Sequence, residues 1–158
     1  MRDVICATLA SPSQGCRMAV PTWFNIVIAW KQPDLESSGL QGINVAQVHC
    51  VFHLPSELGT FSTLLAYVEW FTDFQQPDLV TGMFRIQRSS CAYVCNTSII
   101  PIDQIIHSCH LIPVFGCYCD PLLTSHTALD QCSSFFVNHY LWHVNFVFYR
   151  TSMRHMFS

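Results

Sequence analysis

The stretch that most constrains the fold of this chain is VAQVHCVFHLP at residues 45–55. Every second side chain along one side of it is apolar, namely Ala46, Val48, Cys50, Phe52 and Leu54. Successive side chains of a β-strand point to opposite faces, so this period of two predicts a half-buried antiparallel strand that ends at Pro55. Because Cys50 falls on the apolar side, we expect it to act as a small hydrophobic residue of the core.

Further short strands are predicted by runs of β-branched and aromatic residues that lie between turn signals. They cover residues 22–31, 64–74, 83–89, 96–106 with a break at Pro101, 110–115 and 144–150. The run LLAYVEWFTDF at 64–74 is apolar enough to be buried on both faces or nearly so, and Glu69 is its one ambiguous position. Five to seven strands at hairpin spacing predict a mainly β fold, either a small antiparallel barrel or a curled sheet.

One late helix is expected in the stretch LTSHTALDQCSSFFVNHYLWH at residues 123–143. Thr124 or Ser125 would cap its N-terminus. The spacing of its apolar side chains predicts a buried stripe of Leu129, Cys132, Phe136 and Tyr140. A strand remains the alternative over 124–143. With the helix included, the fold class is α+β with a dominant sheet.

The domain organisation follows from length and pattern. A chain of 158 residues fits one domain. We expect a poorly ordered leader at 1–18, a single β-rich domain at 19–150 and a tail at 151–158. The longest apolar stretch, at 24–30, is interrupted by Asn25 and is too short to span a membrane. The leader is a poor signal peptide, so we expect an intracellular protein, nuclear or cytoplasmic.

The charge pattern argues against a nucleic-acid footprint. The chain has seven Lys plus Arg residues, of which Lys31 is the one lysine, and its formal net charge is -3. The basic residues do not cluster, so phosphate binding has no evident electrostatic source.

The cysteines raise the question of a zinc site. Four thiolates would come from Cys91, Cys95, Cys117 and Cys119, with Cys109 or His110 as substitutes. A structural zinc site usually has two ligand pairs, with two to four residues between the ligands of each pair. The first pair fits that range, but the second has one intervening residue, which is tight. We therefore favour unrelated thiols, expect no metal and no cofactor, and keep a zinc-stabilised binding module as an alternative.

Catalytic patterns are weak. His139 and His143 would share a helix face, but Tyr140 stands where a metalloprotease has its glutamate. Cys109 and His110 are adjacent, and adjacent residues of a strand point to opposite faces, which is poor geometry for activating a thiol.

The acidic residues leave a further alternative open, the remnant of a metal-dependent nuclease. It would need two carboxylates to converge on a metal, such as Glu69 with Asp73 or Asp103 with Asp120. These residues are scattered singly and fall mainly in predicted loops, so we expect no catalytic residues and no enzyme activity.

Five segments in order resemble one recurrent series. They are GLQGINVAQVHCVFHLPSELG, LAYVEWFTDF, GMFRIQRSS, NTSIIPIDQIIHSCHLIPVFG and TALDQCSSFFVNHYLWHVNFVFYR. The series is similar to the C-terminal region of large basidiomycete fungal proteins linked to DNA transposons of the KDZ and Plavaka type. The match covers about residues 19–150. The resemblance implies a non-enzymatic accessory β-rich module, because the catalytic carboxylates of those proteins lie upstream of this region.

The departures from that series indicate a degenerate fragment. Residues 91–95 read Cys-Ala-Tyr-Val-Cys, where the similar proteins are rich in Arg. Those proteins also often carry Arg at the position of Trp142. Single transitions convert CG-containing Arg codons into Cys, Trp, Gln or His. Each such change removes a permanent positive charge. A protein or DNA partner is implied by the resemblance alone. If the intact module uses residues 91–95 for phosphate contacts, we expect this copy to bind DNA weakly.

Overall fold

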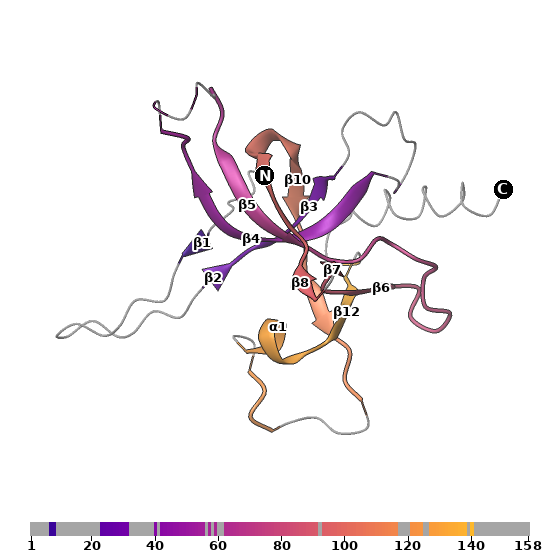
Figure 1. Cartoon of the computed structure of the whole chain (residues 1–158). Coiled ribbons are helices and arrows are strands. Elements are labelled where there is room, and N and C mark those ends of the chain that lie inside the picture. Colours follow the sequence, from indigo (N-terminus) through magenta and orange to yellow (C-terminus); the bar gives the residue numbers. More distant parts are fainter. Residues whose placement is uncertain are drawn as a thin grey trace.

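The computed structural model describes the central part of the chain. The described residues are 7–8, 23–31, 40, 42–55, 57, 59, 62–91, 93–116, 121–124, 127–138 and 140. The expected strand at 144–150 and the expected tail at 151–158 lie outside them. The chain folds as a mainly β protein, as the sequence predicted, and its strands form two larger antiparallel sheets (Figure 1).

The first sheet has five strands. They are β3 (Ile26–Trp30), β4 (Ile43–Phe52), β5 (Leu65–Trp70), β9 (Thr97–Pro101) and β10 (Ile105–Ser108). Their spatial order is β10-β3-β4-β5-β9, and all pairs are antiparallel. The two edge strands, β9 and β10, are joined directly by the 3-10 helix η1 (Ile102–Gln104).

This connection explains why the sheet is curled. A three-residue link can join opposite edges only if the sheet bends until those edges approach each other. The concave side is filled by an inner cluster, which consists of Val27, Ala29, Ala46, Val48, Ala66, Val68, Trp70 and Ile100. Most of these are the small residues Val and Ala, which suit a tightly curved interior. Among the described residues β9 and β10 form no ladder with each other, so the sheet is curled and is not a closed barrel.

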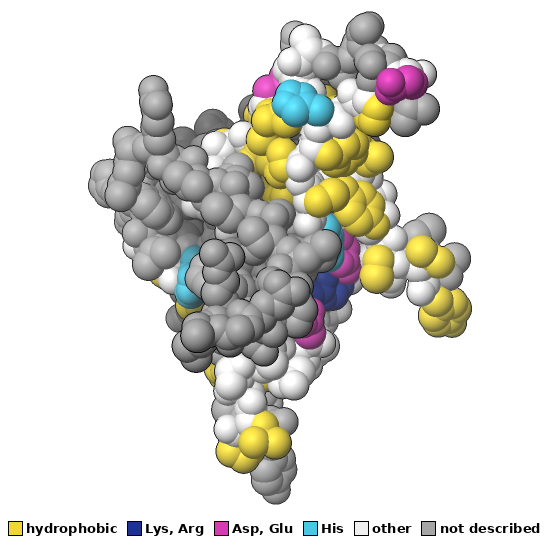
Figure 2. Space-filling model, turned by 90° about the vertical axis from the view of Figure 1, so that its left-hand side faces the viewer, with side chains coloured by type: hydrophobic (Ala, Val, Ile, Leu, Met, Phe, Trp, Pro, Cys, Tyr) yellow, Lys and Arg dark blue, Asp and Glu magenta, His cyan; other side chains and the backbone are white. Residues whose placement is uncertain are grey.

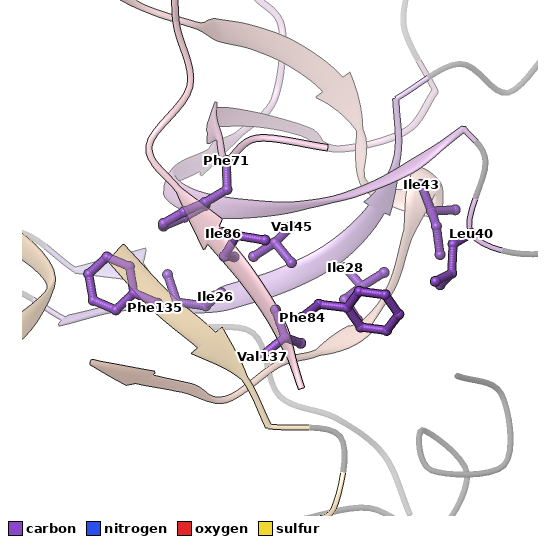
Figure 3. Packing of buried hydrophobic residues seen from close by; sticks show 10 residues of the cluster. All are labelled: Ile26, Ile28, Leu40, Ile43, Val45, Phe71, Phe84, Ile86, Phe135 and Val137. Atoms are coloured by element: carbon purple, nitrogen blue, oxygen red, sulfur yellow. The ribbon is translucent and has the colours of Figure 1, made fainter. Parts of the chain in front are cut away.

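The second sheet has three strands and covers the opposite face of the first. It consists of β6 (Phe84–Gln87), β11 (Leu111–Pro113) and β12 (Ser134–Val137), in the order β11-β12-β6. Between the sheets lies an intersheet core (Figure 3), made of Ile26, Ile28, Leu40, Ile43, Val45, Phe71, Phe84, Ile86, Phe135 and Val137. Within this core the rings of Phe71 and Phe135 pack edge to face, with their centroids 5.9 Å apart.

Strand β6 confirms the alternation read from the sequence. Phe84 and Ile86 are buried, whereas Arg85 and Gln87 are exposed. Strand β5 is likewise buried on both faces, apart from Tyr67.

The prediction for Cys50 was wrong, because β4 contains a β-bulge. Val48 pairs with Val68 of β5 and Cys50 pairs with Tyr67, so His49 is an extra residue in the ladder. Beyond the bulge the two faces exchange, and Val51 instead of Cys50 packs against the inner cluster. Cys50 is exposed as a result.

The smaller elements lie around the two sheets. β1 (Ala7–Thr8) pairs with β2 (Trp23–Phe24). Ala7 and Thr8, which belong to the leader expected to be poorly ordered, therefore form a strand. β7 (Ser90–Cys91) and β8 (Val94–Cys95) form a short hairpin. Tyr93 lies in its turn with a φ of 66°, a left-handed conformation that is uncommon for a residue other than glycine.

The late helix exists but is much shorter than the expected 124–143. α1 covers Ala128–Gln131, its N-cap is Thr127, and strand β12 follows. Pairing explains the strand, because Phe135 lies opposite Ile86 of β6 and both side chains enter the intersheet core. Within the described part of the chain, no helix has the length and apolar character needed to cross a membrane.

Candidate functional site

The most concentrated polar chemistry is centred on Glu69, a carboxylate that is only 7% exposed. It lies on β5 between Gln47 of β4 and Thr97 of β9. Its Oε2 atom lies 3.0 Å from Nε2 of His49 and 2.9 Å from Nη1 of Arg88. The thiol of Cys95 makes a smaller contribution that also lowers the pKa of this carboxylate. The bulge in β4 is what directs His49 toward this position.

Arg88 ties the cluster to the rest of the fold. Its backbone forms an isolated β-bridge with Phe71, which links the five-stranded sheet to the end of β6. Its guanidinium carbon lies 5.7 Å from the centre of the Phe71 ring. Nη2 donates a hydrogen bond of 3.0 Å to the carbonyl of Leu129 and lies 3.6 Å from the carboxylate of Asp130. One side chain therefore joins β5, β6 and α1.

The electrostatics of the cluster favour an ionised Glu69. Burial alone would raise its pKa, but the charge of Arg88 and the hydrogen bonds from Arg88, His49 and Cys95 outweigh burial and lower the pKa. A carboxylate that is held ionised and is already bonded to Arg88 and His49 is a poor general acid or base. The arrangement is that of a structural ion-pair network.

Gln47 is a polar residue buried beside this network. It lies directly opposite Glu69 on the neighbouring strand and is 2% exposed. Its Oε1 atom is a buried acceptor without a hydrogen-bond partner. Such a group carries a desolvation cost of roughly 1–3 kcal/mol.

The surface next to the network is apolar. Cys50, Tyr67 and Ile99 lie in one row across β4, β5 and β9, with Thr97 two residues from Ile99, and we call these four residues the Tyr67 face. Tyr67 is 38% exposed and Ile99 is 58% exposed. Figure 2 shows one side of the molecule on which hydrophobic side chains gather beside a small group of acidic, basic and histidine side chains.

The cysteines proposed for zinc are only partly covered by the described residues. Cys91 pairs with Val94 and Cys95 pairs with Ser90, so the two cysteines do not face each other across the hairpin. Cys95 is exposed. Cys117 and Cys119 lie outside the described residues. Within the described ranges, no three His, Cys, Asp or Glu side chains are grouped as they would be around a metal ion.

Cys109 and His110, the proposed substitutes, also have separate surroundings. Cys109 packs against the intersheet core, and burial raises the pKa of its thiol to about 12. His110 is exposed, and its Nδ1 lies 3.5 Å from Nδ2 of Asn138. His139 and His143 lie outside the described residues.

The carboxylates proposed for a nuclease remnant also have separate partners. Glu69 belongs to the network above. Asp73 accepts hydrogen bonds of 2.6 Å from Asn44 and 3.1 Å from Lys31. Asp103 is exposed on η1, and Asp120 lies outside the described residues.

Sequence reasoning missed His49 and Arg88 as partners of Glu69. The available signal was a single glutamate in an otherwise apolar strand, since a buried carboxylate is expected to have a cationic partner. Comparisons with protein-family models, with curated proteins and with solved structures found no match.

Proposed function

We propose that this chain is a non-enzymatic, transposon-derived interaction module whose Tyr67 face binds another protein. The observation that carries the proposal is the exposure of Tyr67 and Ile99 side by side on a sheet face that continues from the buried intersheet core. Exposed apolar residues that gather on one face are typical of protein-interaction surfaces. Aromatic residues such as tyrosine are enriched at the centres of these surfaces.

The charges favour a protein over a nucleic acid as partner. The described residues include six carboxylates and three Lys or Arg side chains. Lys31 is paired with Asp73, and Arg88 is paired with Glu69. Nucleic-acid binding needs basic side chains that are available to phosphates. The proposal of a transposon origin depends on the sequence resemblance, which covers the segments that form β4, β5, β6 and β9.

A peptide selection on the whole chain tests this proposal. A displayed library of unconstrained peptides is selected on the immobilised protein, and the selected peptides are measured against the double variant Tyr67→Ser/Ile99→Ser. The matched control is Leu79→Ser, because Leu79 is fully exposed in a turn away from these strands. We expect the double variant to lose at least about tenfold in affinity, which corresponds to roughly 1.4 kcal/mol, and the control to lose little.

Two further measurements test the alternatives to this proposal. One is filter binding of single-stranded and double-stranded DNA at low and high salt, where tight and strongly salt-dependent binding would favour a nucleic-acid module. The other is elemental analysis of the purified protein. One zinc ion per chain would favour the zinc-stabilised alternative.

A further inference from the structure

The strand β9 forms a free edge of the five-stranded sheet. It pairs with β5 on one side, and among the described residues no strand pairs with its other side. Exposed edges are commonly blunted by charged side chains, by proline or by bulges. The sequence of β9, TSIIP, contains no charged residue, and its proline is the last position.

The register of β5 and β9 determines which backbone groups face that edge. Trp70 N–H donates to the carbonyl of Asn96 at 2.8 Å, and Ile102 N–H donates to the carbonyl of Leu64 at 2.9 Å. In an antiparallel pair, residues alternate between positions that bond to the neighbour and positions that point away. Between these two fixed points, Ser98 and Ile100 therefore bond to β5.

The alternate residues of β9 then present their backbone groups outward. Thr97 and Ile99 direct both N–H and C=O to the free edge, while Pro101 is the N-cap of η1 and has no N–H. The side chains of Thr97 and Ile99 are exposed and belong to the Tyr67 face. Backbone donors and acceptors at an edge, with exposed side chains beside them, are the requirements for adding a strand.

We propose that the partner binds by adding an extended segment to β9 as a sixth strand of the sheet. The added backbone bonds to Thr97 and Ile99. An apolar side chain of the segment packs on Ile99 and reaches Tyr67. The inference rests on the proposed function and specifies its binding mode.

Charge indicates what kind of segment fits this edge. Asp103 is exposed on η1, two residues beyond Pro101, and among the described residues no Lys or Arg pairs with it. A segment that extends past Pro101 therefore gains from a Lys or Arg at that end. A second copy of this chain is disfavoured, because each copy has a net charge of -3 and the two copies repel each other. The occupant is thus a basic, apolar extended segment of a different protein.

The test uses the full chain and the peptides selected from the displayed library. Amide hydrogen exchange of Thr97 and Ile99 is measured by NMR with and without peptide. We expect the free protein to exchange these two amides rapidly and the bound protein to protect them at least about tenfold, because exchange then requires the added strand to leave. We also expect the selected peptides to be enriched in Lys or Arg.

A backbone variant provides the second measurement. Thr97→Pro removes an N–H that β5 does not use, whereas Thr97→Ala removes only the side chain. We expect Thr97→Pro to weaken peptide binding roughly tenfold and Thr97→Ala to weaken it by less than about threefold. If circular dichroism shows that Thr97→Pro is unfolded, the exchange data on the unmodified chain still test whether the peptide adds a strand to β9.

The other outcomes separate this proposal from the function it rests on. Peptides that need Tyr67 and Ile99 but leave the two amides unprotected overturn strand addition and leave the interaction surface intact. A selection that yields no peptide overturns both. Protection of the same amides that rises with protein concentration, without peptide, identifies a second copy as the occupant and overturns the choice of partner. Selected peptides without added basic residues overturn the charge argument.

Discussion

Nη1 of Arg88 lies 2.9 Å from Oε2 of Glu69, and this contact joins the two sheets through a pair of residues that are far apart in sequence. Arg88 also donates to the carbonyl of Leu129, so the pair fixes α1 as well. Because Glu69 is almost completely buried, replacing its carboxylate leaves the partly buried Arg88 without its buried ion-pair partner.

Replacing Glu69 by Gln should therefore destabilise the protein. We expect the free energy of unfolding to fall by about 1.5–3 kcal/mol, the range for hydrogen bonds to charged groups. The matched control is Asp130→Asn, since Asp130 is exposed and lies 3.6 Å from the same arginine. Its effect should be under about 0.5 kcal/mol. Urea denaturation measures both, and equal effects of the two changes would contradict the role given to Glu69.

The same carboxylate makes stability depend on pH. The pKa of Glu69 is lowered in the folded protein, so the unfolded chain binds a proton more readily. The stabilisation from Glu69 is present above the pKa of an unfolded glutamate, about 4.3, and is lost as the pH falls through the lower folded value. We expect the stability difference between the natural chain and Glu69→Gln to shrink below that pH. A difference that stays constant down to about pH 3 would refute this linkage.

Gln47 offers a change that should stabilise the fold. Its Oε1 atom is buried without a hydrogen-bond partner, so Gln47→Met replaces a costly polar group by an apolar one of similar size. We expect a gain of about 1 kcal/mol in the free energy of unfolding. Gln87→Met, at an exposed position of β6, is the control and should have little effect. A clear loss for Gln47→Met would indicate a bound water that the methionine displaces.

The cysteines should differ in reactivity. Cys50 and Cys95 are exposed, whereas burial raises the pKa of Cys109 to about 12. Since the thiolate is the reactive form, we expect iodoacetamide at about pH 8 to modify Cys109 at least tenfold more slowly than the other two. Peptide mapping by mass spectrometry measures each site. Rapid modification of Cys109 in the folded protein would contradict its place against the intersheet core.

Local sequence patterns were sufficient to predict most of the strands and the fold class. The alternation in FRIQ predicted both the strand β6 and the faces of its four residues. The strand β12 was predicted only as an alternative to a helix, because Leu129, Cys132 and Phe136 also fit a helical period. Pairing of Phe135 with Ile86, which is distant in sequence, decides the structure there.

The bulge at His49 and the site itself depend on longer-range contacts. Nothing in VAQVHCVFHLP marks one residue as extra, so the faces beyond it were exchanged and Cys50 was misplaced. The sequence showed the lone Glu69 in an apolar strand, but its two partners come from β4 and from the residue that follows β6. Finding His49 and Arg88 required the register of β4 with β5 and the bridge at Phe71.

The position of β10 directly after the short link η1 also affects how the chain folds during its synthesis on the ribosome. β3 needs β10 as its second neighbour, and β10 is made only after most of the other strands. Until then β3 has an open side, and the emerging polypeptide is exposed to misassociation. Assembly should be slow and cooperative, because the pairing of β10 with β3 joins segments that are distant along the chain.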